Sequence, residues 1–100
     1  MDVSIDKLLA YTLDSGASDL HLSSGSTPMV RIHGDMKKLD LPSLTESQIQ
    51  SIKNHVLNEN QKKVFDENLE IDFSTELKGQ GRFRVNIFQQ LKGTAAVFRT

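Results

Sequence analysis

The chain has 100 residues, 37% of them hydrophobic and 25% charged, with a formal net charge of -1. This size predicts one domain over residues 1–100 around one core, and the near-neutral charge lacks the basic excess typical of nucleic-acid-binding proteins. The absence of cysteine excludes disulfides, thiol nucleophiles and cysteine-ligated zinc. The acidic N-terminus is unlike a signal peptide, and no apolar run reaches the roughly 18 residues of a transmembrane helix.

The first forty residues indicate a helix followed by short strands. Apolar residues at helical spacing predict a helix over about residues 3–15, which Ser15-Gly16 would end. A turn is expected at Gly34-Asp35, between segments that pair as a hairpin. The strands expected in this region are 20–22, 29–32 and 36–41.

Two further helices are expected after Pro42. Thr45 and Gln48 form a capping box, which starts the second helix near Thr45. Its apolar stripe consists of Ile49, Ile52 and Val56. Asn58 can cap a third, short helix that ends near Asn68, with Val64 and Phe65 as its apolar anchors.

The C-terminal third predicts an antiparallel meander of three strands. Over 69–77 apolar and polar residues alternate strictly, as in a half-buried strand. Turns at 78–81 and 91–93 separate it from two more strands. The residues expected to point inward are Leu69, Ile71, Phe73, Thr75, Leu77, Phe83, Val85, Ile87, Ala96 and Phe98. The predicted fold class is therefore α+β, an antiparallel sheet flanked by about three helices.

Three of the four arginines, Arg82, Arg84 and Arg99, fall on the polar face of this meander. A two-residue loop at Leu91-Lys92 would place Arg84 opposite Arg99 and Val85 opposite Phe98. Like charges opposite each other cost a few tenths of a kcal/mol, so an anion is expected to compensate them. That anion is either a nucleotide polyphosphate, which guanidinium groups bind in pairs, or a carboxylate of the neighbouring strand.

The register of the first turn bears on this choice. A three-residue loop at 78–80 would set Glu76 opposite Arg82 and Ser74 opposite Arg84, an ordinary ladder of surface charges. The residues alone leave both interpretations open, and Arg82 is the arginine most readily explained as structural.

Asp19 and His21 share one strand face, where they could form an acid/base pair or part of a metal site. No third ligand follows at a useful spacing, so an interface or capping hydrogen-bond role is favoured and no metal site is expected. His33 and His55 lack neighbouring ligands and are expected to be structural or exposed. No phosphate-binding loop of the form G-x-x-x-x-G-K-[ST] occurs in the 100 residues.

Four ordered blocks of sequence resemble a known family. They are Gly16-Ala-Ser-Asp-Leu-His-Leu22, Pro28-Met-Val-Arg-Ile-His-Gly-Asp35, Gly81-Arg-Phe-Arg-Val-Asn86 and Ala96-Val-Phe-Arg-Thr100. In this order they resemble the N-terminal domain of the type IV pilus retraction ATPases, the PilT family of twitching motility proteins in the secretion ATPase superfamily. The resemblance covers nearly the whole chain.

This resemblance implies a PAS-like domain joined to a RecA-like motor domain that lies beyond residue 100. It also implies a homohexameric ring, in which this domain packs on the motor domain of its own and the adjacent chain. The ring would act in the cytoplasm beneath an inner-membrane pilus platform protein, with which it associates peripherally.

The resemblance further implies that Arg84 and Arg99, with Arg82 as a weaker third, contact the ATP phosphates. The ATP-hydrolysing motifs of the family would lie beyond Thr100. The complete protein is therefore expected to hydrolyse ATP with Mg²⁺, whereas this fragment is expected to have no catalytic residue and no tightly bound cofactor.

Two alternatives stand beside this interpretation. The first is the same module in a pilus extension or type II secretion ATPase. The second is a free-standing PAS-like sensor that holds a small ligand inside the sheet. The inward apolar residues of the meander argue against a sensor, because they look like ordinary core rather than the lining of a cavity.

Overall fold

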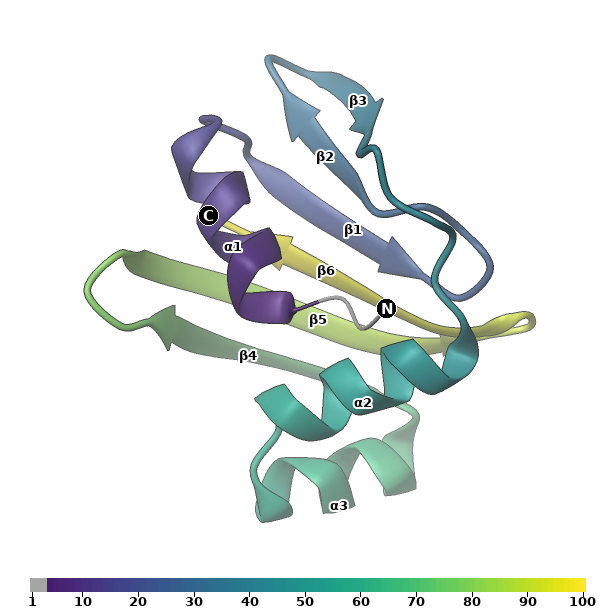
Figure 1. The fold of residues 1–100 in the computed structure, drawn as a ribbon. Helices are drawn as coiled ribbons and strands as arrows, with labels where there is room; N and C mark the ends of the chain where they lie inside the picture. Colours follow the sequence, from purple (N-terminus) through teal and green to yellow (C-terminus); the bar gives the residue numbers. More distant parts are fainter. Residues whose placement is uncertain (1–3) are drawn as a thin grey trace.

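The structure, a computed structural model, describes residues 4–100 as three helices and six strands. The helices are α1 (Ile5–Asp14), α2 (Glu46–Val56) and α3 (Glu59–Asn68). The strands are β1 (Asp19–Ser23), β2 (Met29–Ile32), β3 (Asp35–Lys38), β4 (Glu70–Leu77), β5 (Gly81–Gln90) and β6 (Gly93–Arg99). The α+β class and the C-terminal meander predicted from the sequence are confirmed, and Figure 1 shows their arrangement.

All six strands form one antiparallel sheet in the order β3-β2-β1-β6-β5-β4. The first and last strands of the chain are therefore neighbours in the middle of the sheet. Asp19 of β1 lies opposite Arg99 of β6, and Leu20 lies opposite Phe98. This pairing joins the N-terminal hairpin to the meander.

The sheet has an apolar face, which packs against the helices, and a polar face on its other side. In Figure 1, α1 crosses in front of the sheet while α2 and α3 lie along one side of it. The largest fully buried side chains of this core come from the inward positions of the strands, from α2 and from the segment just before α2. They are Phe83, Phe98, Leu20, Leu22, Leu44, Ile49, Ile87, Val30 and Val85, each at most 1% exposed.

The helix starts follow the local sequence. Thr45 accepts a hydrogen bond from the Gln48 backbone N–H, and the Gln48 side chain accepts one from the Thr45 N–H, so the predicted capping box is confirmed. Asn58 caps α3 through the same reciprocal arrangement with Gln61. Ser4 caps α1, and the part of the first predicted helix up to residue 3 lies outside the described residues.

Three expectations about the elements are wrong. Leu69 is not an inward strand residue: it caps α3 in the left-handed conformation (φ 58°) and is 54% exposed, because the helix continues to Asn68. Val64 is 42% exposed, which leaves Phe65 as the buried anchor of α3. The strand expected over 36–41 ends at Lys38: the Leu39 N–H still bonds the Pro28 carbonyl in register with the Met29–Lys38 pair, but Pro28 has no N–H with which to continue the ladder.

The hairpin between β5 and β6 is held next to its turn by a polar cluster. Thr94, fully buried, donates its backbone N–H to Glu46 Oε1 at 2.9 Å and its hydroxyl to Glu46 Oε2 at 3.0 Å. Gln50 Nε2 donates to the same carboxylate oxygen at 2.8 Å. Burial opposes the charge on Glu46, but hydrogen bonds from Thr94, Gln50 and Ser24 outweigh it and lower the pKa of that carboxyl.

Candidate functional site

A row of charged residues crosses the polar face of the sheet. The registers of β2, β1, β6 and β5 place Arg31, Asp19, Arg99 and Arg84 directly beside one another in that order. Because directly opposite residues in an antiparallel sheet point to the same side, these four side chains share the polar face. The predicted pairing of Arg84 with Arg99, and of Val85 with Phe98, is confirmed.

The first turn also has the predicted register. Glu76 lies opposite Arg82 and Ser74 opposite Arg84. No ion pair joins Glu76 to Arg82 among residues 4–100; instead Arg84 reaches diagonally to Asp72 on β4. A carboxylate of the neighbouring strand is therefore one compensating anion for the arginines.

Asp72 holds Arg84 through two contacts. Arg84 Nε donates to Asp72 Oδ1 at 3.2 Å, and Arg84 Nη2 donates to Asp72 Oδ2 at 3.3 Å. The pair is solvent-exposed, with the arginine side chain 70% and the aspartate side chain 48% accessible. These hydrogen bonds raise the pKa of Arg84, which stays a cation.

Unlike Arg84, Arg99 and Arg82 have no carboxylate partner within residues 4–100. Both are exposed, and within residues 4–100 neither guanidinium group makes a hydrogen bond or ion pair. Arg99 lies between the carboxylate-bearing strand β1 and Arg84, so its charge faces a like charge on one side. Two adjacent guanidinium groups with free N–H donors can bind the oxygens of one phosphate chain.

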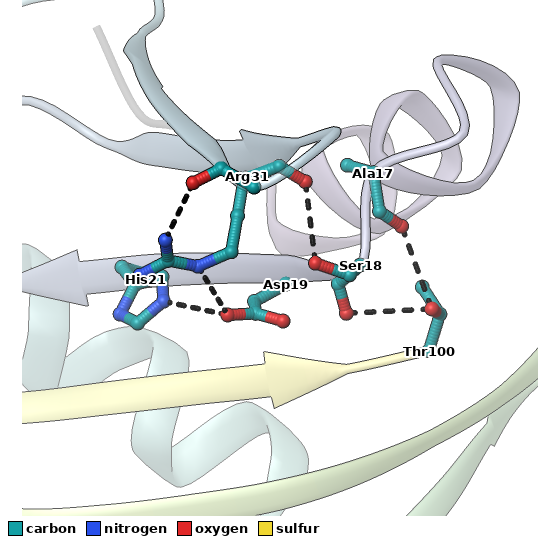
Figure 2. Close-up of polar contacts among 7 residues, drawn as sticks. Ala17, Ser18, Asp19, His21, Arg31 and Thr100 are labelled. Atoms are coloured by element: carbon teal, nitrogen blue, oxygen red, sulfur yellow. Dashed lines mark hydrogen bonds and ion pairs between the residues drawn. The ribbon is translucent and has the colours of Figure 1, made fainter.

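Asp19 and His21 come together as expected, with His21 Nε2 3.1 Å from Asp19 Oδ2 (Figure 2). Arg31, which the sequence did not single out, donates from Nε to the same oxygen at 3.3 Å and from Nη1 to the Gly34 carbonyl at 3.0 Å. Burial opposes the charged form of Asp19, yet hydrogen bonds from His21, Ser18 and Arg31 lower its pKa.

The residue after β6, Thr100, hydrogen-bonds the backbone directly before Asp19. Thr100 donates its backbone N–H to the Ser18 carbonyl at 3.0 Å, and Figure 2 shows its hydroxyl beside the carbonyl oxygens of Ala17 and Ser18. The backbone of Ala17 and Ser18, directly before Asp19, therefore holds the strand end that carries Arg99. Asp19 hydrogen-bonds His21 and Arg31, and the place of Asp19 and His21 at an interface stays a prediction.

Other candidate groups lie apart from this row. His33 is exposed in the turn between β2 and β3, and His55 is exposed on α2, 4.0 Å from Asp6. Across residues 4–100 no group of three or more histidine, cysteine or carboxylate side chains could hold a metal ion. The helices of the same residues are too short or too polar to cross a bilayer.

The inward residues of the meander form packed core. Phe83, Val85, Ile87, Ala96 and Phe98 are each at most 2% exposed and belong to one hydrophobic cluster with the helices. These side chains fill the space between the sheet and the helices. The sensor interpretation requires a ligand in that space, so the packed core argues against it.

No family model matches the chain. Individual relatives do match it. The type IV pilus retraction ATPase PilT of Pseudomonas aeruginosa is 48% identical over 98 residues, which is 98% of this chain and 28% of that protein. The twitching motility protein of Neisseria gonorrhoeae is 47% identical over 74% of this chain and 20% of its own length. This chain thus spans about a quarter of the relatives that it matches.

Solved structures agree with the sequence comparison. A crystal structure of the pilus retraction motor PilT with bound ADP superimposes with a TM-score of 0.89 and 39% identity, over 99% of this chain and 29% of that one. The ATPase DotB of Legionella pneumophila shares the fold alone, with a TM-score of 0.81 and 20% identity over 96% of this chain and 28% of that one. The resemblance inferred from the four sequence blocks is therefore confirmed across the chain.

Proposed function

We propose that this chain, a homologue of the type IV pilus retraction ATPases over nearly its whole length, is the N-terminal domain of such a motor. The match in both sequence and fold to a retraction motor that binds ADP carries the proposal. The relatives at 47–48% identity are a retraction ATPase and a twitching motility protein, whereas the type IV pilus ATPase PilU is 32% identical, which favours a PilT-type motor. The same module of a pilus extension or type II secretion ATPase stays the alternative.

In this proposal Arg84 and Arg99 contact the phosphates of ATP, and Arg82 is a weaker third contact. Their adjacent places on the polar face support it, because a pair of guanidinium groups matches phosphate oxygens and neutralises charge that develops during phosphoryl transfer. The free donors of Arg99 add to this support. Movement of the domain against its motor domain would insert or withdraw the two arginines and so couple nucleotide state to the shape of a ring.

The domain itself supplies no hydrolytic machinery in this proposal. It has no phosphate-binding loop, and its described residues offer no metal cluster, so a RecA-like motor domain would hold ATP and its Mg²⁺. The partners are motor domains of the same and the adjacent chain in a homohexamer, with Asp19 and His21 near that contact. The assembled motor would work in the cytoplasm against a pilus platform protein of the inner membrane.

The test grafts this chain into the Pseudomonas aeruginosa retraction ATPase in place of its matching segment. ATP hydrolysis and assembly are measured for Arg84→Ala and Arg99→Ala, with Lys38→Ala as a control that removes an exposed positive charge from the far strand of the same face. Loss of an arginine that stabilises the transferred phosphoryl group lowers kcat by about 10³-fold. Unchanged hydrolysis in an assembled ring would assign both arginines to the surface charge ladder.

A further inference from the structure

The contact between Asp72 and Arg84 uses only one edge of the guanidinium group. The carboxylate accepts from Nε and from Nη2, which are neighbouring donors on the side of the group. Arg84 has five N–H donors in a rigid plane. Two of them are taken by Asp72, and the remaining three are on Nη1 and Nη2, where one N–H of each points to the outer end of the side chain.

This leaves the outer end of Arg84 available to a second anion. The Nη1 group keeps both of its N–H bonds, and Nη2 keeps one, so the pair can still bind two phosphate oxygens in parallel. Asp72 at the same time restricts the rotation of a long side chain that is 70% exposed and would otherwise sample many rotamers. The ion pair therefore orients the arginine without closing its outer donors.

We propose that Asp72 is a positioning residue that holds the outer end of Arg84 ready for a nucleotide phosphate. The inference rests on the proposed function and deepens it, because it names the residue that orients one of its two arginines. The orienting carboxylate comes from β4, whereas Arg99 and Arg82 have no such partner within residues 4–100. Arg84 is thus the arginine whose geometry is set before the nucleotide is present.

Competition between Asp72 and phosphate for Arg84 would change the rate in the opposite direction from orientation. A carboxylate that competed with phosphate for Arg84 would slow the motor, and its removal would raise the rate. A carboxylate that orients Arg84 through the side edge is needed for full rate, and its removal would lower it. The side-edge contact favours orientation. A phosphate at the outer end would bind N–H groups of Arg84 that Asp72 does not use, so the two anions do not compete for the same donors.

A double-mutant cycle in the grafted ATPase separates these effects. Asp72→Ala is measured with Arg84 present and with Arg84→Ala. Because exposed ion pairs contribute little, the expected fall in kcat is about fivefold with Arg84 present, and none when Arg84 is already alanine. The KM for ATP stays within about twofold, since the side chain orients a group rather than binding substrate.

Two further variants sharpen the test. Asp72→Asn keeps an acceptor oxygen for Nε and should restore part of the lost kcat. Glu76→Ala removes a carboxylate from the same strand and face, opposite Arg82 and unconnected to Arg84, and should leave kcat unchanged.

The outcomes distinguish this inference from the proposed function. If Arg84→Ala leaves hydrolysis unchanged, both are overturned. If Arg84→Ala lowers kcat but Asp72→Ala leaves it unchanged or raises it, only the positioning role is overturned. An equal fall in both Arg84 backgrounds would show that Asp72 acts on the fold rather than on the arginine.

Discussion

The hydroxyl of Thr94 is expected to contribute measurably to the stability of the fold. Thr94→Val keeps the shape of this fully buried side chain but removes the group that donates to Glu46 at 3.0 Å and accepts from Gln50 at 3.0 Å. Hydrogen bonds to charged groups contribute roughly 1.5–3 kcal/mol, so a loss of about 2 kcal/mol is expected. For a chain of this size that corresponds to a fall of about 8–16 °C in Tm.

Urea denaturation of the 100-residue chain measures this loss as a midpoint shift of about 1–2 M at constant slope. Thr75→Val is the matched control, because the half-buried Thr75 hydroxyl makes no hydrogen bond within residues 4–100. The loss should also depend on pH. The pKa of Glu46 lies below its ordinary value of 4.5, so its stabilising charge is present above that value and disappears as the pH falls through the lowered pKa. A difference between variant and parent that is as large at pH 3 as at pH 7 would refute this account of the cluster.

Two further predictions concern backbone space and acid stability. Gly93→Ala should destabilise the chain by about 1–3 kcal/mol in the same denaturation assay, because its φ is 135° and a Cβ would lie 2.7 Å from Glu46 Oε1. Gly79→Ala, with a φ of 76° but open space around it, should cost only about 1 kcal/mol, and equal losses would contradict the role of the collision. Asp19→Asn should destabilise the chain near neutral pH, and its difference from the parent should shrink as the pH falls below the ordinary value of 3.8, since the folded pKa of Asp19 lies lower still. A difference that grows on acidification, measured by thermal melting, would argue against this charge.

Local patterns predicted the parts of the fold that depend on neighbours in the chain. The alternation after Asn68 fixed the meander, and the two short loops fixed its registers, because side chains in a strand alternate and tight loops set the pairing. The capping box at Thr45 was equally readable. Leu69 misled the prediction because it continues the alternation, although helix α3 ends there in a left-handed residue.

The long-range pairing could not be predicted in the same way. Nothing local indicates that β1 lies beside β6, and this pairing alone brings Asp19 opposite Arg99. Arg31 was missed for the same reason, since its contact with Asp19 requires the pairing of β1 with β2. The contact between Arg84 and Asp72 was nearer to being predictable from the sequence. Arg84 was assigned to the polar face, and the alternation over 69–77 puts Asp72 on that face too, but the contact is diagonal rather than directly across.

The central place of β6 also governs the order in which the fold can form. Its neighbours β1 and β5 belong to two hairpin systems that make no strand contact with each other except through β6. During synthesis at about 5–20 residues per second, the N-terminal hairpin must wait several seconds for its partner strand to be made. Pairings between such distant segments close slowly, because the entropy of the intervening loop is lost before any contact is gained. The nascent chain therefore carries two open strand edges until residue 99 has left the ribosome, and this is the interval in which a chaperone or a second copy could pair with it.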